Sequence, residues 1–103
     1  MNRIIEEKLD ELKGLCRKYR VQRLEIFGSG TNEATFDRLE SDLDFLVEFL
    51  PLKSGEYADV YFGLLESLEE LFERPVDLVM ARAVNNPYFL ESINKSRKVV
   101  YAA

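Results

Sequence analysis

The sequence contains no histidine and no tryptophan, and its single cysteine is Cys16. Without an imidazole, Ser-His and Cys-His catalysis and His-ligated zinc are excluded. One cysteine cannot form an internal disulfide, and no apolar run approaches the roughly 20 residues of a membrane span or the form of a signal peptide. We therefore expect carboxylates to carry any acid, base or metal chemistry, in a cytoplasmic protein that does not bind membranes.

Length and charge narrow the possibilities further. The chain has 103 residues, of which 14 are basic and 19 acidic, which gives a net charge of −5. This length is typical of one domain, and we expect residues 1–103 to form a single one. The negative net charge argues against electrostatic binding of duplex DNA by the protein surface as a whole, so a polyanionic ligand would need a local binding site.

The hydrophobic pattern predicts a small α/β fold. Ile5, Leu9, Leu12 and Cys16 recur at helical spacing and indicate an amphipathic helix over 2–18. Short runs rich in β-formers, ended by glycine or proline, indicate strands. The resulting order is helix 2–18, strand 21–27, strand 43–49, helix 57–72, strand 76–80, helix 87–96 and a last edge strand 99–101. We expect a mixed sheet of three or four strands with helices covering one face.

The helix expected at 57–72 is apolar at ten of its sixteen positions, which is wider than one core-facing stripe. It either lies between the sheet and a neighbouring helix, or it presents a surface to a partner or to a second copy of the chain. The pattern favours neither interpretation.

Three carboxylates stand out because of their settings. Asp42 and Asp44 are two residues apart at the start of a strand, so their side chains leave the same face with Cα atoms roughly 6.5–7 Å apart. Asp77 lies in the apolar strand Val76-Asp77-Leu78-Val79, where a charge needs a partner. On adjacent strands the three would converge, as a one- or two-ion Mg²⁺ site requires. The alternative is a solvated strand edge.

Gly28-Ser29 ends the strand that precedes these carboxylates. Glycine allows the backbone to approach a ligand closely, and Ser29 offers a hydroxyl and an N–H group of the kind that binds phosphate. The alternative is an ordinary turn at the end of a strand.

Together these residues resemble the signature of the minimal nucleotidyltransferases of the DNA polymerase beta superfamily. That signature is Gly-Ser, a spacer, Asp-x-Asp on the next strand and one Asp on a later strand. Here it reads Phe27-Gly28-Ser29, twelve residues, Asp42-Leu43-Asp44 and then Asp77, across nearly the whole chain. Many members carry a basic residue and a second glycine soon after Gly-Ser, whereas this chain continues Gly30-Thr31-Asn32-Glu33 and has its first cation at Arg38.

The resemblance implies a polymerase beta-like palm fold and Mg²⁺-dependent transfer of a nucleotidyl group from ATP or another nucleoside triphosphate. It makes Asp42 and Asp44 metal ligands, Asp77 a third ligand or base, and Gly28 and Ser29 the residues that hold the triphosphate. It also implies an antitoxin that transfers AMP to a hydroxyl of a HEPN-type helical partner protein. The alternative is a non-catalytic binding or antitoxin module with a degenerate nucleotide site.

Overall fold

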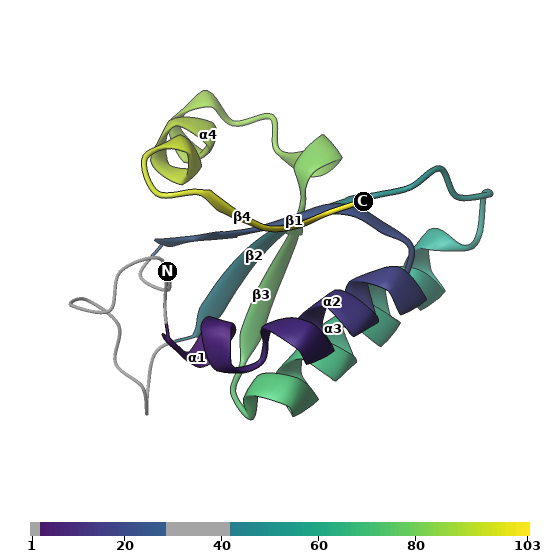
Figure 1. The fold of residues 1–103 in the computed structure, drawn as a ribbon. Coiled ribbons are helices and arrows are strands. Elements are labelled where there is room, and N and C mark those ends of the chain that lie inside the picture. Colours follow the sequence, from purple (N-terminus) through teal and green to yellow (C-terminus); the bar gives the residue numbers. More distant parts are fainter. Residues whose placement is uncertain (1–2, 29–41) are drawn as a thin grey trace.

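The structure is a computed structural model that describes residues 3–28 and 42–103. Its four strands form one mixed sheet in the order β3-β2-β1-β4 (Figure 1), in which β2 is antiparallel to β1 and parallel to β3, and β1 is antiparallel to β4. The strands are β1 Val21–Phe27, β2 Leu43–Phe49, β3 Val76–Met80 and β4 Lys98–Ala102. The mixed α/β class and the first three strands are confirmed with their predicted bounds, and the edge strand is one residue longer at each end.

The helices differ from the prediction at their boundaries. They are α1 Arg3–Glu7, α2 Leu9–Lys18, α3 Tyr57–Phe72 and α4 Pro87–Asn94, with a short 3₁₀ turn at Ala81–Ala83. The single helix expected over 2–18 is wrong, because it is interrupted at Lys8, whose N–H donates to the Ile5 carbonyl three residues back. The apolar spacing continues through this break, so periodicity could not reveal it. Helix α4 ends two residues earlier than expected.

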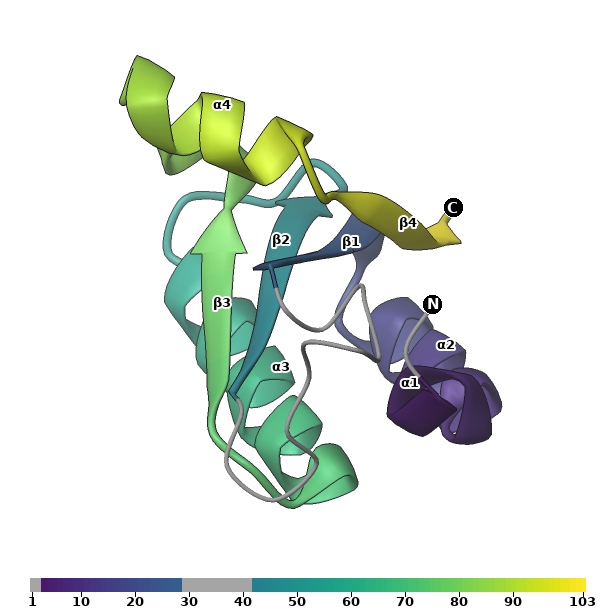
Figure 2. The same cartoon turned by 90° about the vertical axis from the view of Figure 1, so that its left-hand side faces the viewer.

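Helices lie on both faces of the sheet, which corrects the expectation of one covered face. Figures 1 and 2 show α1, α2 and α3 on one side and α4 on the other. Alternate strand residues face the two sides: Leu24, Ile26 and Phe45 are buried under the first layer, whereas Phe27 and Leu46 pack with Ile93 of α4. The second face therefore has its own small apolar cluster.

Helix α4 begins as the sequence predicts. The Asn86 side chain accepts hydrogen bonds from the N–H groups of Tyr88 and Phe89, and Pro87 occupies the first helical turn. These contacts satisfy backbone donors that would otherwise lack an intrahelical partner.

The wide apolar surface of α3 is mostly used within the fold. Val60, Leu64, Leu68 and Phe72 are buried, and flanking side chains such as Leu65 pack against the same core. Helix α3 packs against both the sheet and α2, beside which it lies on the same face, as the packing interpretation requires, and a partner surface on its exposed side stays a prediction. A homo-oligomer stays a prediction. In the described ranges no helix combines the length and apolarity that crossing a membrane requires.

Close packing between α2 and α3 depends on Gly63. A Cβ atom at this position would lie 2.5 Å from Cε1 of Tyr19, the residue at the C-terminal end of α2. Ser67, one turn further along α3, donates a hydrogen bond to the Tyr19 hydroxyl. The Tyr19 ring therefore occupies the space that a side chain at position 63 would need.

We expect Gly63→Ala to lower the free energy of unfolding by about 1–3 kcal/mol, because the added methyl overlaps the Tyr19 ring. Gly14→Ala is the matched control, since Gly14 is also helical and a Cβ atom there would meet nothing within 4 Å. It should stabilise the protein by up to about 1 kcal/mol through helix propensity. Urea unfolding measures both, and equal effects of the two substitutions would contradict the packing argument.

Candidate functional site

Three chain segments meet at one end of the sheet. Because β2 runs antiparallel to β1 and parallel to β3, the end of β1 lies beside the starts of both other strands. Gly28 follows the last residue of β1, Asp42 precedes β2, and Asp77 is the second residue of β3. The adjacency that the sequence analysis required of the two Asp-bearing strands is therefore present.

The register places Asp44 at the centre of this site. Its direct partners are Asp77 on β3 and Phe27 on β1. Phe27 packs in the α4-side cluster, so the Asp44 side chain also leaves the sheet on the α4 face, and so does that of Asp77, whose neighbour Leu78 is buried on the opposite face. Asp44 is half-buried, whereas Asp42 and Asp77 are exposed.

The electrostatics of the site are those of an acidic cluster. Burial, followed by the negative charges of Asp77 and Asp42, raises the pKa of Asp44 to about 6. Burial and the Asp77 charge also raise the pKa of Tyr61, whose hydroxyl donates to the Leu78 carbonyl. The three carboxylates are thus close enough for their charges to be felt at Asp44. A divalent cation would counter their repulsion.

Metal binding itself stays a prediction. Across residues 3–28 and 42–103, no three His, Cys, Asp or Glu side chains form a ready-made set of metal ligands. The donor set fits Mg²⁺ in kind, since it consists of hard carboxylate oxygens on adjacent strands. Ligation by Asp42, Asp44 and Asp77 together would require adjustment of their side chains.

Gly28 lies directly against the central carboxylate. Its φ is +71°, a conformation that favours glycine, and a Cβ atom there would lie 2.9 Å from Asp44 Oδ2. Its N–H donates to Ser96 Oγ at 2.8 Å. The predicted contact of Gly28 with a ligand remains untested, but the need for glycine is evident. Ser29, the other predicted phosphate-binding residue, lies outside the described residues.

Comparison with known proteins agrees with this geometry. The profile of the family described as Polymerase beta, Nucleotidyltransferase matches residues 10–103. The chain belongs to this nucleotidyltransferase family.

A relative and two solved structures illustrate the similarity. A protein of Methanocaldococcus jannaschii, provisionally named a protein adenylyltransferase, is 32% identical over 95 residues, which cover 84% of this chain and 92% of the relative. A structure described provisionally as a minimal nucleotidyltransferase has a TM-score of 0.72 at 26% identity and covers 95% of both chains. A chain in the complex of a tri-AMPylated Shewanella oneidensis HEPN toxin with its MNT antitoxin matches with a TM-score of 0.65 at 17% identity. The match covers 95% of the present chain and 72% of the chain in that complex.

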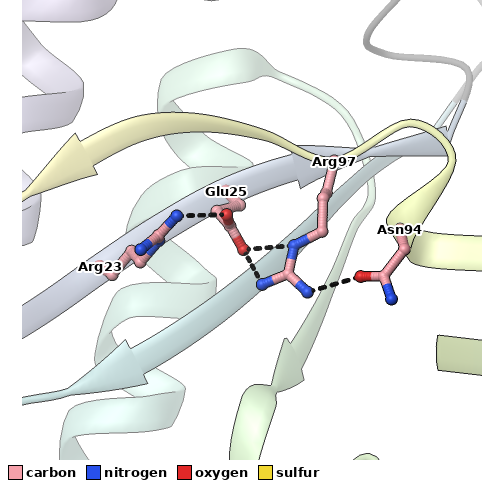
Figure 3. Close-up of polar contacts among 4 residues, drawn as sticks. All are labelled: Arg23, Glu25, Asn94 and Arg97. Atoms are coloured by element: carbon pink, nitrogen blue, oxygen red, sulfur yellow. Dashed lines mark hydrogen bonds and ion pairs between the residues drawn. The ribbon is translucent and has the colours of Figure 1, made fainter.

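An ion cluster around one buried carboxylate, which the sequence pattern did not reveal, lies on the same face of the sheet as the candidate site. Glu25 on β1 is 3% exposed, and Arg97 donates to its Oε2 through Nε at 2.9 Å and through Nη2. Arg23 Nη2 lies 3.1 Å from Oε1, and Arg97 Nη1 donates to Asn94 (Figure 3). A charge within the apolar run Leu24-Glu25-Ile26 was a signal that the sequence offered. Its partner Arg97 could not be identified from the sequence, because it lies 72 residues further along the chain.

We expect Gly28→Ala to displace the Asp44 carboxylate, because the new methyl group would stand 2.9 Å from Oδ2. Gly55→Ala is the matched control, since Gly55 also has a positive φ, +91°, but nothing within 4 Å of the position of a Cβ. Both substitutions should cost roughly 1–2 kcal/mol of stability through backbone strain. Only Gly28→Ala should change the ¹³C chemical shift of the Asp44 carboxyl carbon, and an unchanged shift would show that the contact is unimportant.

Proposed function

We propose that this protein is a Mg²⁺-dependent adenylyltransferase that transfers AMP from ATP to a hydroxyl group of a partner protein. The observation that carries this proposal is the register pair Asp44–Asp77, set on adjacent strands with Gly28 against the Asp44 carboxylate. An acidic pair beside a glycine turn suits a metal-bound triphosphate. The family membership supplies the reaction class.

In this proposal Asp42, Asp44 and Asp77 hold Mg²⁺. When bound, the ion would offset charge on the triphosphate and favour ionisation of the attacking hydroxyl. Asp77 is exposed and lies at the start of β3, where it could instead accept the proton of the incoming hydroxyl. Gly28, lacking a side chain, leaves room for the phosphates next to Asp44.

The bonds exchanged are those of nucleotidyl transfer. The acceptor oxygen forms a bond to the α-phosphorus of ATP, the bond from that phosphorus to the bridging oxygen breaks, and pyrophosphate leaves. The hydroxyl proton passes to a carboxylate of the site. This chain would contribute orientation and charge placement, which are the main sources of catalysis in phosphoryl transfer.

The comparisons support a protein as the acceptor. A relative is named a protein adenylyltransferase, and a chain of similar fold belongs to a complex of an AMPylated HEPN toxin with its MNT antitoxin. We therefore propose that this chain is the antitoxin of a HEPN/MNT-type module and that its partner is a HEPN-type helical protein.

Helix α4 provides a surface on which such a partner could dock. Tyr88 is 83% exposed, and Phe89 and Leu90 are about 40% exposed. Phe89 packs edge-on against Phe27, the residue before Gly28, so this apolar surface is continuous with the site. A partner that covers it would bring its own hydroxyl to the triphosphate.

The double substitution Asp42→Asn and Asp44→Asn should abolish AMP transfer and weaken Mg-ATP binding at least tenfold, because it removes two of three anionic ligands. The fold should be retained, since neutral amides remove the mutual repulsion at Asp44. Calorimetry measures binding. The candidate partner is the protein that the neighbouring gene encodes, and intact-mass analysis of this protein after co-expression detects the added adenylyl group. Unchanged Mg-ATP affinity would exclude the proposed site. If the double variant still neutralised the partner, and the partner showed no mass shift even when co-expressed with the parent chain, the protein would instead be a non-catalytic antitoxin.

Substituting Tyr88 and Leu90 by serine should weaken binding of the same partner at least tenfold while leaving Mg-ATP affinity within twofold of the parent, because these side chains flank the site without lining it. Phe62→Ser is the matched control, since Phe62 is 57% exposed on α3, across the sheet from α4. Pull-down and calorimetry measure the two affinities. An equal loss of partner binding in the control would place the docking surface elsewhere.

A further inference from the structure

The Gly28 turn is attached to a part of the chain that the nucleotidyltransferase signature does not include. The Gly28 N–H donates to Ser96 Oγ at 2.8 Å, across 68 residues of sequence. Ser96 lies just after α4, between the end of that helix and the start of β4. A serine hydroxyl in this position fixes the direction of the backbone amide that it accepts from.

Ser96 is itself held in place from two sides. Its own N–H and that of Arg97 donate to the carbonyl of Ile93, and the Ile93 side chain is buried against the α4 face of the sheet. Arg97, the next residue, is bound to the buried carboxylate of Glu25 on β1. Ion pairs of this kind keep their geometry because an unpaired buried carboxylate is costly. The corner between α4 and β4 is thus anchored to β1, the strand that Gly28 directly follows.

The residue that makes this hydrogen bond is also the one that lies against the acidic cluster. Gly28 adopts a φ of +71° and approaches Asp44 so closely that a Cβ atom would lie 2.9 Å from Oδ2. A backbone conformation of this kind is retained only where contacts with the surrounding structure hold it. The Ser96 hydroxyl contacts the backbone at this position.

We propose that Ser96 is a positioning residue of the nucleotide site, whose hydroxyl holds the amide of Gly28 and so keeps the turn at a fixed distance from the Asp44 carboxylate. This inference rests on the nucleotidyl-transfer function proposed above. Arg97 and Glu25 support Ser96 by anchoring the corner on which it lies.

The test compares four proteins: the parent chain, Ser96→Ala, Ser96→Thr and Ser92→Ala. Threonine keeps the hydroxyl, and Ser92 is an exposed serine of α4 that serves as the matched control. NMR hydrogen exchange reports on the Gly28 amide, calorimetry gives the dissociation constant for Mg-ATP, and thermal unfolding shows whether each variant is folded.

In Ser96→Ala we expect the Gly28 amide to exchange at least fivefold faster and the dissociation constant for Mg-ATP to rise about fivefold, the factor for one lost neutral hydrogen bond. Ser96→Thr and Ser92→Ala should stay within twofold of the parent in both measurements. Should Ser96→Ala fail to fold, Ser96→Cys replaces it, because sulfur is a weak acceptor and should give the same result.

The possible failures are distinguishable. A parent chain that does not bind Mg-ATP would overturn the proposed function, and the positioning role with it. Mg-ATP binding by the parent and by Ser96→Ala with equal affinity, or an unchanged exchange rate of the Gly28 amide, would overturn the role of Ser96 alone. Equal losses in Ser96→Ala and Ser92→Ala would show a general effect of altering α4 rather than the action of this hydroxyl.

Discussion

The hydrogen bonding of β2 to two different neighbours is the constraint on which the rest of the structure depends. Antiparallel pairing with β1 and parallel pairing with β3 bring the end of β1 and the starts of β2 and β3 to the same end of the sheet. The same register places Asp44 directly opposite Asp77, and alternation along each strand turns both side chains to the α4 face. A shift of one residue would send Asp44 into the core beneath α1–α3.

The two faces of the sheet have different tasks. The face under α1, α2 and α3 is apolar and holds most of the core, whereas the α4 face combines a small apolar cluster with the ion pair of the buried Glu25 and with Asp44 and Asp77. Burial, followed by repulsion from Asp77 and Asp42, raises the pKa of Asp44, so the charged form of this side chain costs stability. A site that tolerates such a cost is typical of regions that serve binding or catalysis rather than folding.

Helix α4 connects the proposed docking surface to the candidate site. Its exposed apolar side chains lie near its start, Ile93 anchors it to the sheet, and the residues after its last turn reach Gly28 and Glu25. Because both ends of this short segment contact β1 or residues beside it, a partner seated on α4 would lie directly next to the triphosphate.

The sequence by itself determined the strands, the extent of α3, the N-cap at Asn86 and the Asp-x-Asp, Gly28 and Asp77 pattern, because strand and helix periods, caps and short motifs are local in the chain. It did not determine the break at Lys8, the placement of α4 on the second face, or the pairing of Glu25 with Arg97 and of Gly28 with Ser96. These contacts join residues far apart in sequence, or follow from the way helices pack on a sheet. Several cations could have paired with the Glu25 carboxylate, and several hydroxyls could have accepted from the Gly28 amide. Only the tertiary structure selects among them.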